Sequence, residues 1–207
     1  LANAIFLVPA SRMADILGYR RSYLLGALIV AISCALSVFA PTYPLLLFLR
    51  VCAAVGTSFL LITGLAILSR VYPAKERGGA FGINTAMVYI GASAGPIIGG
   101  FLTGAFGWRS VFLVMVPLAF FAAVPLWKYY RDDVPSSSSG HFDIRGTMLY
   151  AAAMFCIMYG LSTLPDTASL ALALIGGILM ALFIRDELGQ TNPVLHIRLF
   201  FINRRFA

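Results

Sequence analysis

Arg50 is the first residue in this sequence whose type and position could do chemistry. It lies within the apolar stretch 44–70, which is long enough to cross a bilayer. In such a helix Arg50 sits about 9 Å from the end. A charge at that depth costs a few kcal/mol unless a partner satisfies it. This placement is typical of proton transfer or of a polar cavity, but a side chain that snorkels to the membrane surface also explains it.

A second group of charged residues follows the first apolar segment, 1–17. Asp15 lies there among three arginines and a glycine, namely Arg12, Gly18, Arg20 and Arg21. At a helix end near water, a carboxylate and several cations can exchange partners at modest cost, which suits a gate. The alternative is that these arginines only anchor the chain on the cytoplasmic side.

The apolar segment 78–105 is unusually rich in glycine. Gly91, Gly95 and Gly99 are four residues apart and form a ridge about 12 Å long on one helix face. The roughly opposite side holds Ala86, Ser93, Gly100 and Gly104, with Gly82 in the same register. Pro96 removes a backbone donor and is expected to kink the helix near Ala92. Neighbouring helices could approach closely on both sides, as in many polytopic membrane proteins.

Residues that other mechanisms require are missing or isolated. Asp and Glu are absent between Asp15 and Glu76 and between Glu76 and Asp132, so a carboxylate for proton coupling is expected outside this chain. His141 and His196 lie in polar segments and are expected to be solvated. The three cysteines stand singly, and no nucleotide-binding loop occurs. We therefore expect no metal, no cofactor and no enzymatic activity.

Composition indicates where the helices that hold these residues must lie. The 207 residues are 60% hydrophobic and 11% charged, against roughly 25% charged residues in soluble domains. Apolar runs recur along the whole length, which is typical of a multi-pass integral membrane protein. The net charge is +7, but Lys and Arg occur in short clusters between apolar segments, which argues against nucleic-acid binding.

The apolar segments predict a bundle, a linker and two further helices. The bundle occupies 1–129 with spans at about 1–17, 22–40, 44–70, 78–105 and 109–129; a cytoplasmic linker follows at 130–145, two helices at 146–184, and a cytoplasmic segment at 185–207. Thirteen of the fifteen Lys and Arg residues then lie inside, with Arg109 outside beside the interfacial anchor Trp108. The chain starts in an apolar run without Met, so we expect a fragment at both ends.

The glycine-rich segment resembles one known motif throughout. Its pattern is Gly82, eight residues, Gly91, three residues, Gly95-Pro96, two residues, Gly99-Gly100. This resembles the antiporter motif of the major facilitator superfamily, in the fifth transmembrane helix of its proton-coupled drug exporters.

Three other stretches resemble motifs of the same superfamily. Residues 11–21 are similar to its loop motif between helices 2 and 3, with Ser11 and Met13 departing from the pattern. Residues 50–57 resemble its fourth-helix motif, in which Arg50 and Gly56 match. Residues 108–117 look like the start of helix 6 in the fourteen-span drug:proton antiporters of the EmrB/QacA type.

The resemblance implies an all-α polytopic membrane protein with part of a major facilitator fold: helices 2–6 of the N-terminal bundle plus two linker helices. It implies proton-coupled efflux of drugs or other small amphipathic molecules by alternating access, with the loop motif as cytoplasmic gate and Arg50 and Gly56 in proton relay or cavity. The implied partners are a small-molecule substrate, protons and the bilayer of the cell (inner) membrane, with accessory efflux components undefined. The alternatives are an importer or uniporter of a small metabolite, or a non-transporting scaffold or sensor.

Overall fold

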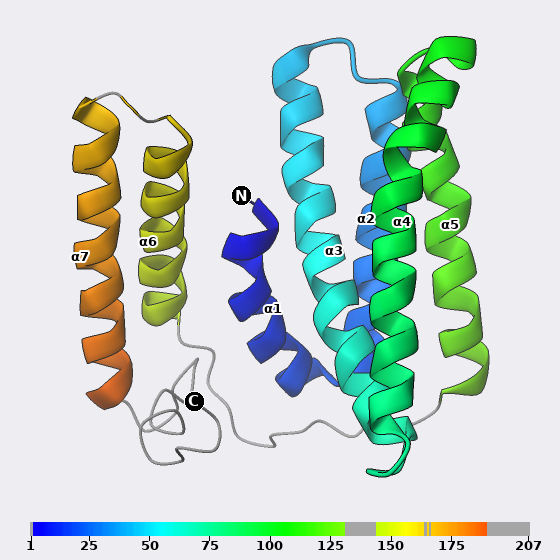
Figure 1. Ribbon diagram of the computed structural model, residues 1–207, viewed down its shortest axis with the longest axis horizontal. Helices are drawn as coiled ribbons and strands as arrows, with labels where there is room; N and C mark the ends of the chain where they lie inside the picture. The colour runs from blue at the N-terminus through cyan, green and yellow to red at the C-terminus, as the bar shows by residue number, and fades with distance from the viewer. Residues whose placement is uncertain (1, 131–143, 164, 166, 190–207) are drawn as a thin grey trace. The chain divides into compact units, whose positions relative to one another are not determined.

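The computed structural model describes residues 2–130, 144–163, 165 and 167–189, and every regular element among them is an α-helix (Figure 1). The helices are α1 Ala2–Leu17, α2 Tyr19–Val38, α3 Tyr43–Val71, α4 Arg77–Phe106, α5 Arg109–Tyr129, α6 Ile144–Ser162 and α7 Thr167–Gly189. The expected all-α fold is therefore confirmed. Each helix lies within a few residues of an expected apolar segment, except that α7 extends to Gly189 instead of ending at 184.

Five of the described helices are long and apolar enough to cross a bilayer. They are α2, α3, α4, α5 and the part of α7 from Thr167 to Glu187. Helix α1 has 16 residues, which is shorter than the hydrocarbon core requires of a straight span. These lengths and compositions describe an integral membrane protein.

Two glycines between helices have a backbone conformation that other residues rarely adopt. Gly18 joins α1 to α2 with φ 90°, and Gly107 joins α4 to α5 with φ 81°. A side chain at such a φ would meet the backbone, so glycine is the residue that fits. Pro44 lies in the first turn of α3, where the missing N–H costs no helical hydrogen bond.

The helices group into two compact units. The second unit, Leu17–Pro135, contains α2 to α5, and α2 packs against both α3 and α5. Helices α2 and α3 approach closely at Gly26 and Gly56: a Cβ added at Gly56 would lie 2.7 Å from the Gly26 carbonyl oxygen. Because neither residue has a side chain, the two backbones reach this distance without a clash.

The first unit contains Leu1–Ile16 and Ser136–Ala207, and so includes α1, α6 and α7. Helices α6 and α7 lie side by side (Figure 1), with Gly160 and Gly176 at their contact. The Tyr150 hydroxyl of α6 donates to the Ala4 carbonyl oxygen of α1 at 3.2 Å, and its ring lies 5.6 Å from that of Phe183. The expected division at 129, 145 and 184 stays a prediction.

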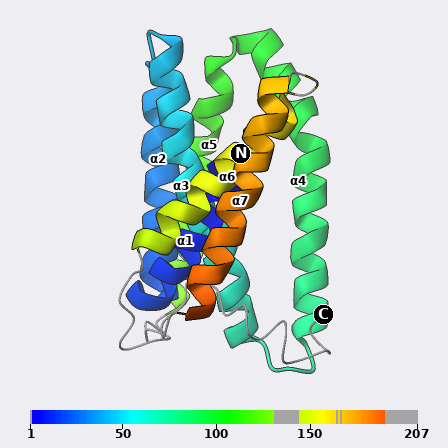
Figure 2. The ribbon, with the colours of Figure 1, turned by 90° about the vertical axis from the view of Figure 1, so that its left-hand side faces the viewer.

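Helix α4 is built differently from the rest of its unit. It runs without interruption through Pro96, yet none of its residues is buried. Figure 2 shows it standing apart from α2 and α3, and it makes few contacts with α3 and α5. The glycine-rich segment therefore forms the expected helix, but the residues of this helix are not buried within the unit.

Candidate functional site

The expected gate residues lie in the second half of α1, in the first turn of α2 and at Gly18 between these helices. Arg12 and Asp15 lie in α1, in the first unit, and their part in a gate stays a prediction. Arg20 lies in the first turn of α2, and its guanidinium donates to the Trp127 carbonyl oxygen near the end of α5 at 2.9 Å. This bond ties the start of α2 to the end of α5, because a cation interacts favourably with the last carbonyls of a helix.

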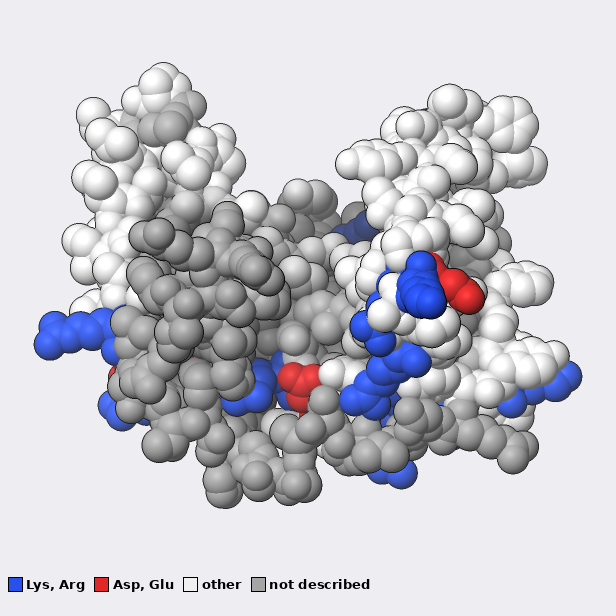
Figure 3. Space-filling view, turned by 60° about the horizontal axis from the view of Figure 1, so that its bottom comes forward, with Lys and Arg blue, Asp and Glu red and all other residues white. Residues whose placement is uncertain are grey.

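Arg70 reinforces the same end of the second unit. Its guanidinium carbon lies 4.5 Å from the centroid of the Tyr19 ring, so the last turn of α3 meets the first turn of α2. This distance is within the range of a cation–π interaction. Figure 3 shows Lys and Arg side chains in a few clusters among uncharged side chains. In the second unit, Arg20 and Arg70 lie at the ends of α2 and α3, and the cytoplasmic location of this end stays a prediction.

Arg50 lies seven residues into α3, about 10 Å from the first residue of that helix. Its guanidinium carbon lies 5.0 Å from the centroid of the Phe112 ring in α5, and the residue is exposed. The face of a phenyl ring attracts a cation electrostatically, so this contact stabilises the guanidinium group away from the helix end. The structure thus supplies Arg50 with an aromatic partner that the sequence reading missed.

Phe112 belongs to a larger group at the end of the unit opposite Arg20. Its ring meets the Trp108 ring edge to face, with centroids 5.9 Å apart. Arg109 stacks over Trp108 at 4.3 Å and donates from Nε to the Val38 carbonyl oxygen of α2 at 2.9 Å. We call these four residues, Arg50, Trp108, Arg109 and Phe112, the cation–aromatic cluster. Trp108 and Phe112 are four apart, a spacing that could have identified Phe112.

Gly56 is explained by packing. It is buried at the crossing with Gly26, a residue that the sequence reading did not single out. A glycine inside each of two consecutive apolar segments was the available signal. The proposed part of Gly56 in a relay or cavity stays a prediction.

The expected antiporter helix is intact but its glycine faces are open. A Cβ added at any of six α4 glycines would have no atom of another described element within 4 Å. The six are Gly82, Gly91, Gly95, Gly99, Gly100 and Gly104. Close approach by neighbouring helices therefore stays a prediction.

Glu187 is an ionisable residue that the sequence reading passed over. The apolar run ends near residue 184, but Arg185, Asp186 and Glu187 continue the helix, since these residue types favour or tolerate it. Glu187 is only 3% exposed. The described spans therefore include one buried carboxylate near the end of α7. Among the described residues no group of three His, Cys, Asp or Glu side chains could hold a metal ion.

Comparison with known proteins places these helices in a family. The family model described as Major Facilitator Superfamily matches residues 1–191. The chain belongs to this superfamily. Proteins of this superfamily are membrane transporters, and five of the described helices are long and apolar enough to cross a membrane.

Three curated relatives illustrate the range of proteins that this family member resembles. It is 30% identical over 206 residues to the multidrug resistance protein Stp of Mycobacterium tuberculosis, covering 97% of this chain and 38% of that protein. It is 33% identical over 196 residues to the riboflavin transporter RibZ of Clostridioides difficile, covering 95% and 42%. It is 28% identical over 205 residues to the tetracenomycin C resistance and export protein of Streptomyces glaucescens, covering 97% and 38%. The chain thus spans about two fifths of the length of the relatives it matches.

Proposed function

We propose that this facilitator exports drugs or other small amphipathic molecules across the cell (inner) membrane in exchange for protons, by alternating access. The observation that carries the proposal is that the whole glycine–proline pattern lies within a single uninterrupted helix, α4, of 30 residues. That pattern resembles the motif of the exchangers in this superfamily. Relatives named for multidrug resistance and for export support the same direction of transport.

The open faces of α4 suit a helix that packs against moving partners. Alternating access in this superfamily requires two halves to rock around a central site. We propose that Gly91, Gly95 and Gly99 receive a neighbouring helix closely in the complete protein, because glycine leaves room for a second backbone. Pro96 weakens the helix locally and marks where it bends during the cycle.

We propose that the charged residues on either side of Gly18 act as a gate, and that the opposite end of the second unit is an anchor. We assign the gate to Arg12, Asp15, Gly18, Arg20 and Arg21, whose charges can change partners near water. The Arg20 bond to the Trp127 carbonyl oxygen supports this assignment, because it is a polar contact between the ends of two helices that could break and form again as the helices move. At the other end, Trp108 and Arg109 anchor the unit at the membrane interface.

Arg50 and Gly56 are proposed to serve the cavity or the proton path. The contact that supports this proposal is the stacking of the Arg50 guanidinium over the Phe112 ring. The coupling carboxylate is proposed to lie elsewhere in the protein. The two helices α6 and α7 are proposed to be the extra pair of a fourteen-span antiporter of the EmrB/QacA type.

A second candidate function is transport of a small metabolite without exchange against protons. The similarity to a protein named as a riboflavin transporter favours it. A non-transporting scaffold or sensor on the same fold is the candidate from another class. Unchanged substrate flux after Asp15→Ala and Arg50→Ala would favour that third reading.

A counterflow measurement separates these functions. The protein in its complete natural form is placed in vesicles with an acidic interior, and a fluorescent amphipathic cation is added on the cytoplasmic side. Antiport predicts that the dye releases protons from the interior, in proportion to dye movement. Dye or riboflavin movement without proton release would replace exchange by uniport, and absence of both movements would contradict transport.

A further inference from the structure

The first turn of α5 contacts each of the other helices of the second unit. Arg109 donates from Nε to the carbonyl oxygen of Val38, the last residue of α2, at 2.9 Å. The Ser110 hydroxyl donates to a carbonyl oxygen near the end of α4 at 3.0 Å. The Phe112 ring lies 5.0 Å from the guanidinium carbon of Arg50 in α3. Three side chains of one turn therefore determine how it lies against α2, α3 and α4.

Arg50 is the residue of α3 that this turn contacts, and it lies inside a helix long and apolar enough to cross a bilayer. A guanidinium group is always charged, so at a depth of about 10 Å its surroundings must stabilise the charge. The described part of the second unit contains one carboxylate, that of Glu76, which precedes α4. Helix α4, about 45 Å long, lies between Glu76 and the turn that leads to α5. The Phe112 ring, rather than an acid of this unit, is therefore the partner of the guanidinium.

Phe112 is itself held by a neighbouring ring. Its ring meets the Trp108 ring edge to face, with centroids 5.9 Å apart and an angle of 86° between the planes. This geometry is favourable for two aromatic rings. Phe112 is half-buried, whereas Arg50 is exposed and its long side chain has more rotamers to lose. The ring is therefore the fixed partner, and the guanidinium is the group that it orients.

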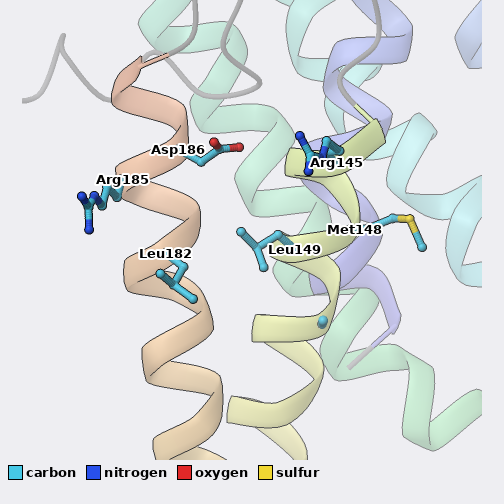
Figure 4. A pocket seen from close by; sticks show the side chains of 7 residues that line it. Arg145, Met148, Leu149, Leu182, Arg185 and Asp186 are labelled. Atoms are coloured by element: carbon cyan, nitrogen blue, oxygen red, sulfur yellow. The ribbon is translucent and has the colours of Figure 1, made fainter.

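The arginines along α6 and α7 have a different setting. Arg145 and Arg185 border an open groove on this helix pair. Figure 4 shows Arg185 extending away from α6, whereas the Asp186 carboxylate lies on the side of α7 toward Arg145. Among the described residues neither of these two arginines stacks on an aromatic ring. The ring beside Arg50 is therefore a particular arrangement and not a general consequence of apolar surroundings.

We propose that Phe112 is a positioning residue, which orients the Arg50 guanidinium for its part in transport. This rests on the proposed function, in which Arg50 serves the cavity or the proton path. The negative face of the ring attracts the guanidinium, so an aliphatic side chain could fill much of the space without orienting the cation. Ser110 ties the same turn to α4. A movement of the glycine-rich helix therefore reaches Arg50 through Phe112.

Nuclear magnetic resonance of the protein in its complete natural form, with isotope-labelled arginine, tests the contact directly. The Nε–H signal of Arg50 is identified by its loss in Arg50→Lys. The ring is expected to shift this signal upfield, and Phe112→Leu is expected to move it to the position of an arginine without an aromatic neighbour. Phe112→Tyr keeps a ring and is expected to keep the shift. A signal that stays in place in Phe112→Leu overturns the proposal, whatever the transport measurements show.

Transport of the amphipathic dye into vesicles tests the role of the contact. Phe112→Leu is expected to lower the transport rate about two- to fivefold, the size of a cation–π contact at an exposed site. Phe112→Tyr is expected to restore most of the rate. A ring-fluorinated phenylalanine at position 112 keeps the shape of the side chain but weakens the negative ring face, so it is expected to transport more slowly than Phe112→Tyr. A wild-type rate with the fluorinated ring would mean that Phe112 acts by packing alone, and would overturn the proposal.

Two controls separate this proposal from the proposed function. Phe120→Leu removes an exposed ring from the same helix and is expected to keep the wild-type rate, and an equal loss in that variant overturns the proposal. Arg50→Gln is expected to impair transport, and wild-type flux in this variant removes Arg50 from the proposed function. Impaired flux in Arg50→Gln together with unaffected flux in Phe112→Leu overturns the positioning role alone. If the dye or riboflavin moves without proton release, uniport replaces exchange, and the Phe112 variants are compared on that flux.

Discussion

The core of α2, α3 and α5 and the neighbouring helix α4 use glycine in opposite ways. At the crossing of α2 and α3, Gly26 and Gly56 bring two backbones into contact. On α4 the glycines recur at helical spacing, and a Cβ added at any of them would meet no described atom within 4 Å beyond the helix's own backbone. The comparison teaches that a glycine pattern predicts a capacity for close approach, whereas the identity of the neighbour depends on the rest of the protein.

The arginine contacts follow the same division. The core is tied at one end by Arg20 to the Trp127 carbonyl oxygen and at the other by Arg109 to the Val38 carbonyl oxygen. Helix α4 is joined to α5 chiefly around the turn, where the Ser110 hydroxyl donates to the Leu102 carbonyl oxygen at 3.0 Å. The core is therefore a braced unit, and α4 is free to pack elsewhere. The following substitutions would break or sharpen this contrast.

Gly56→Leu should have the largest effect, because it damages the core itself. Its Cβ would meet the Gly26 carbonyl oxygen at 2.7 Å and a methyl group of Val30 at 2.9 Å. Such overpacking destabilises a protein by about 1–3 kcal/mol or more. Detergent-solubilised protein should lose its monodisperse peak and melt at a lower temperature than wild type. Gly104→Leu on α4 is the control, and equal loss in both would erase the contrast.

Gly95→Leu should abolish transport while leaving the protein inserted and folded. The position is open in this unit, so leucine meets no described atom, and helix propensity improves by up to about 1 kcal/mol. We expect dye efflux from cells to fall to background with unchanged membrane abundance. Preserved efflux would refute the proposed packing role of the glycine ridge.

Phe112→Leu should weaken the cation–aromatic cluster by a smaller amount. Arg50 and Trp108 each lose a ring contact, and a cation–π interaction at an exposed site is worth about 0.5–1 kcal/mol. The melting temperature should drop more than for Phe120→Leu, which changes an exposed phenylalanine on the same helix. Identical melting of the two variants would mean that the cluster contributes nothing measurable.

Arg20→Gln should have the smallest effect on stability, about 0.3–1 kcal/mol for a cation that binds a carbonyl oxygen in the last turn of a helix. Because the substitution removes the hydrogen bond between α2 and α5, the transport rate should change more than the melting temperature. Lys75→Gln serves as the charge control. A transport rate identical to that of wild type would remove Arg20 from the proposed gate.

Most of the fold could be predicted from the sequence, because apolar length determines where membrane helices lie. The α4 segment shows this well: 78–105 was expected and Arg77–Phe106 is observed. The end of α7 could not be placed in this way, since Arg185 to Glu187 are charged yet continue the helix. Hydropathy marks where a segment leaves the hydrocarbon, whereas backbone hydrogen bonding decides where the helix stops.

The site was predictable only in part. Arg50, Gly56, Trp108 and Arg109 were singled out by residue type and position, but their partners were not. Phe112, Val38 and Gly26 are ordinary residues of apolar segments, and they became identifiable once α2, α3 and α5 were packed together. A single sequence contains no information on which faces of two helices meet when each helix is apolar all round.

By itself the sequence determined that this protein is helical, lies in a membrane and carries the motif pattern of a facilitator, because those properties depend on local composition and spacing. Only the tertiary structure decided which glycines are in contact, which ring holds Arg50, and that Glu187 is buried. Those properties depend on helix rotation and crossing, which arise when backbones far apart in the sequence compete for the same space.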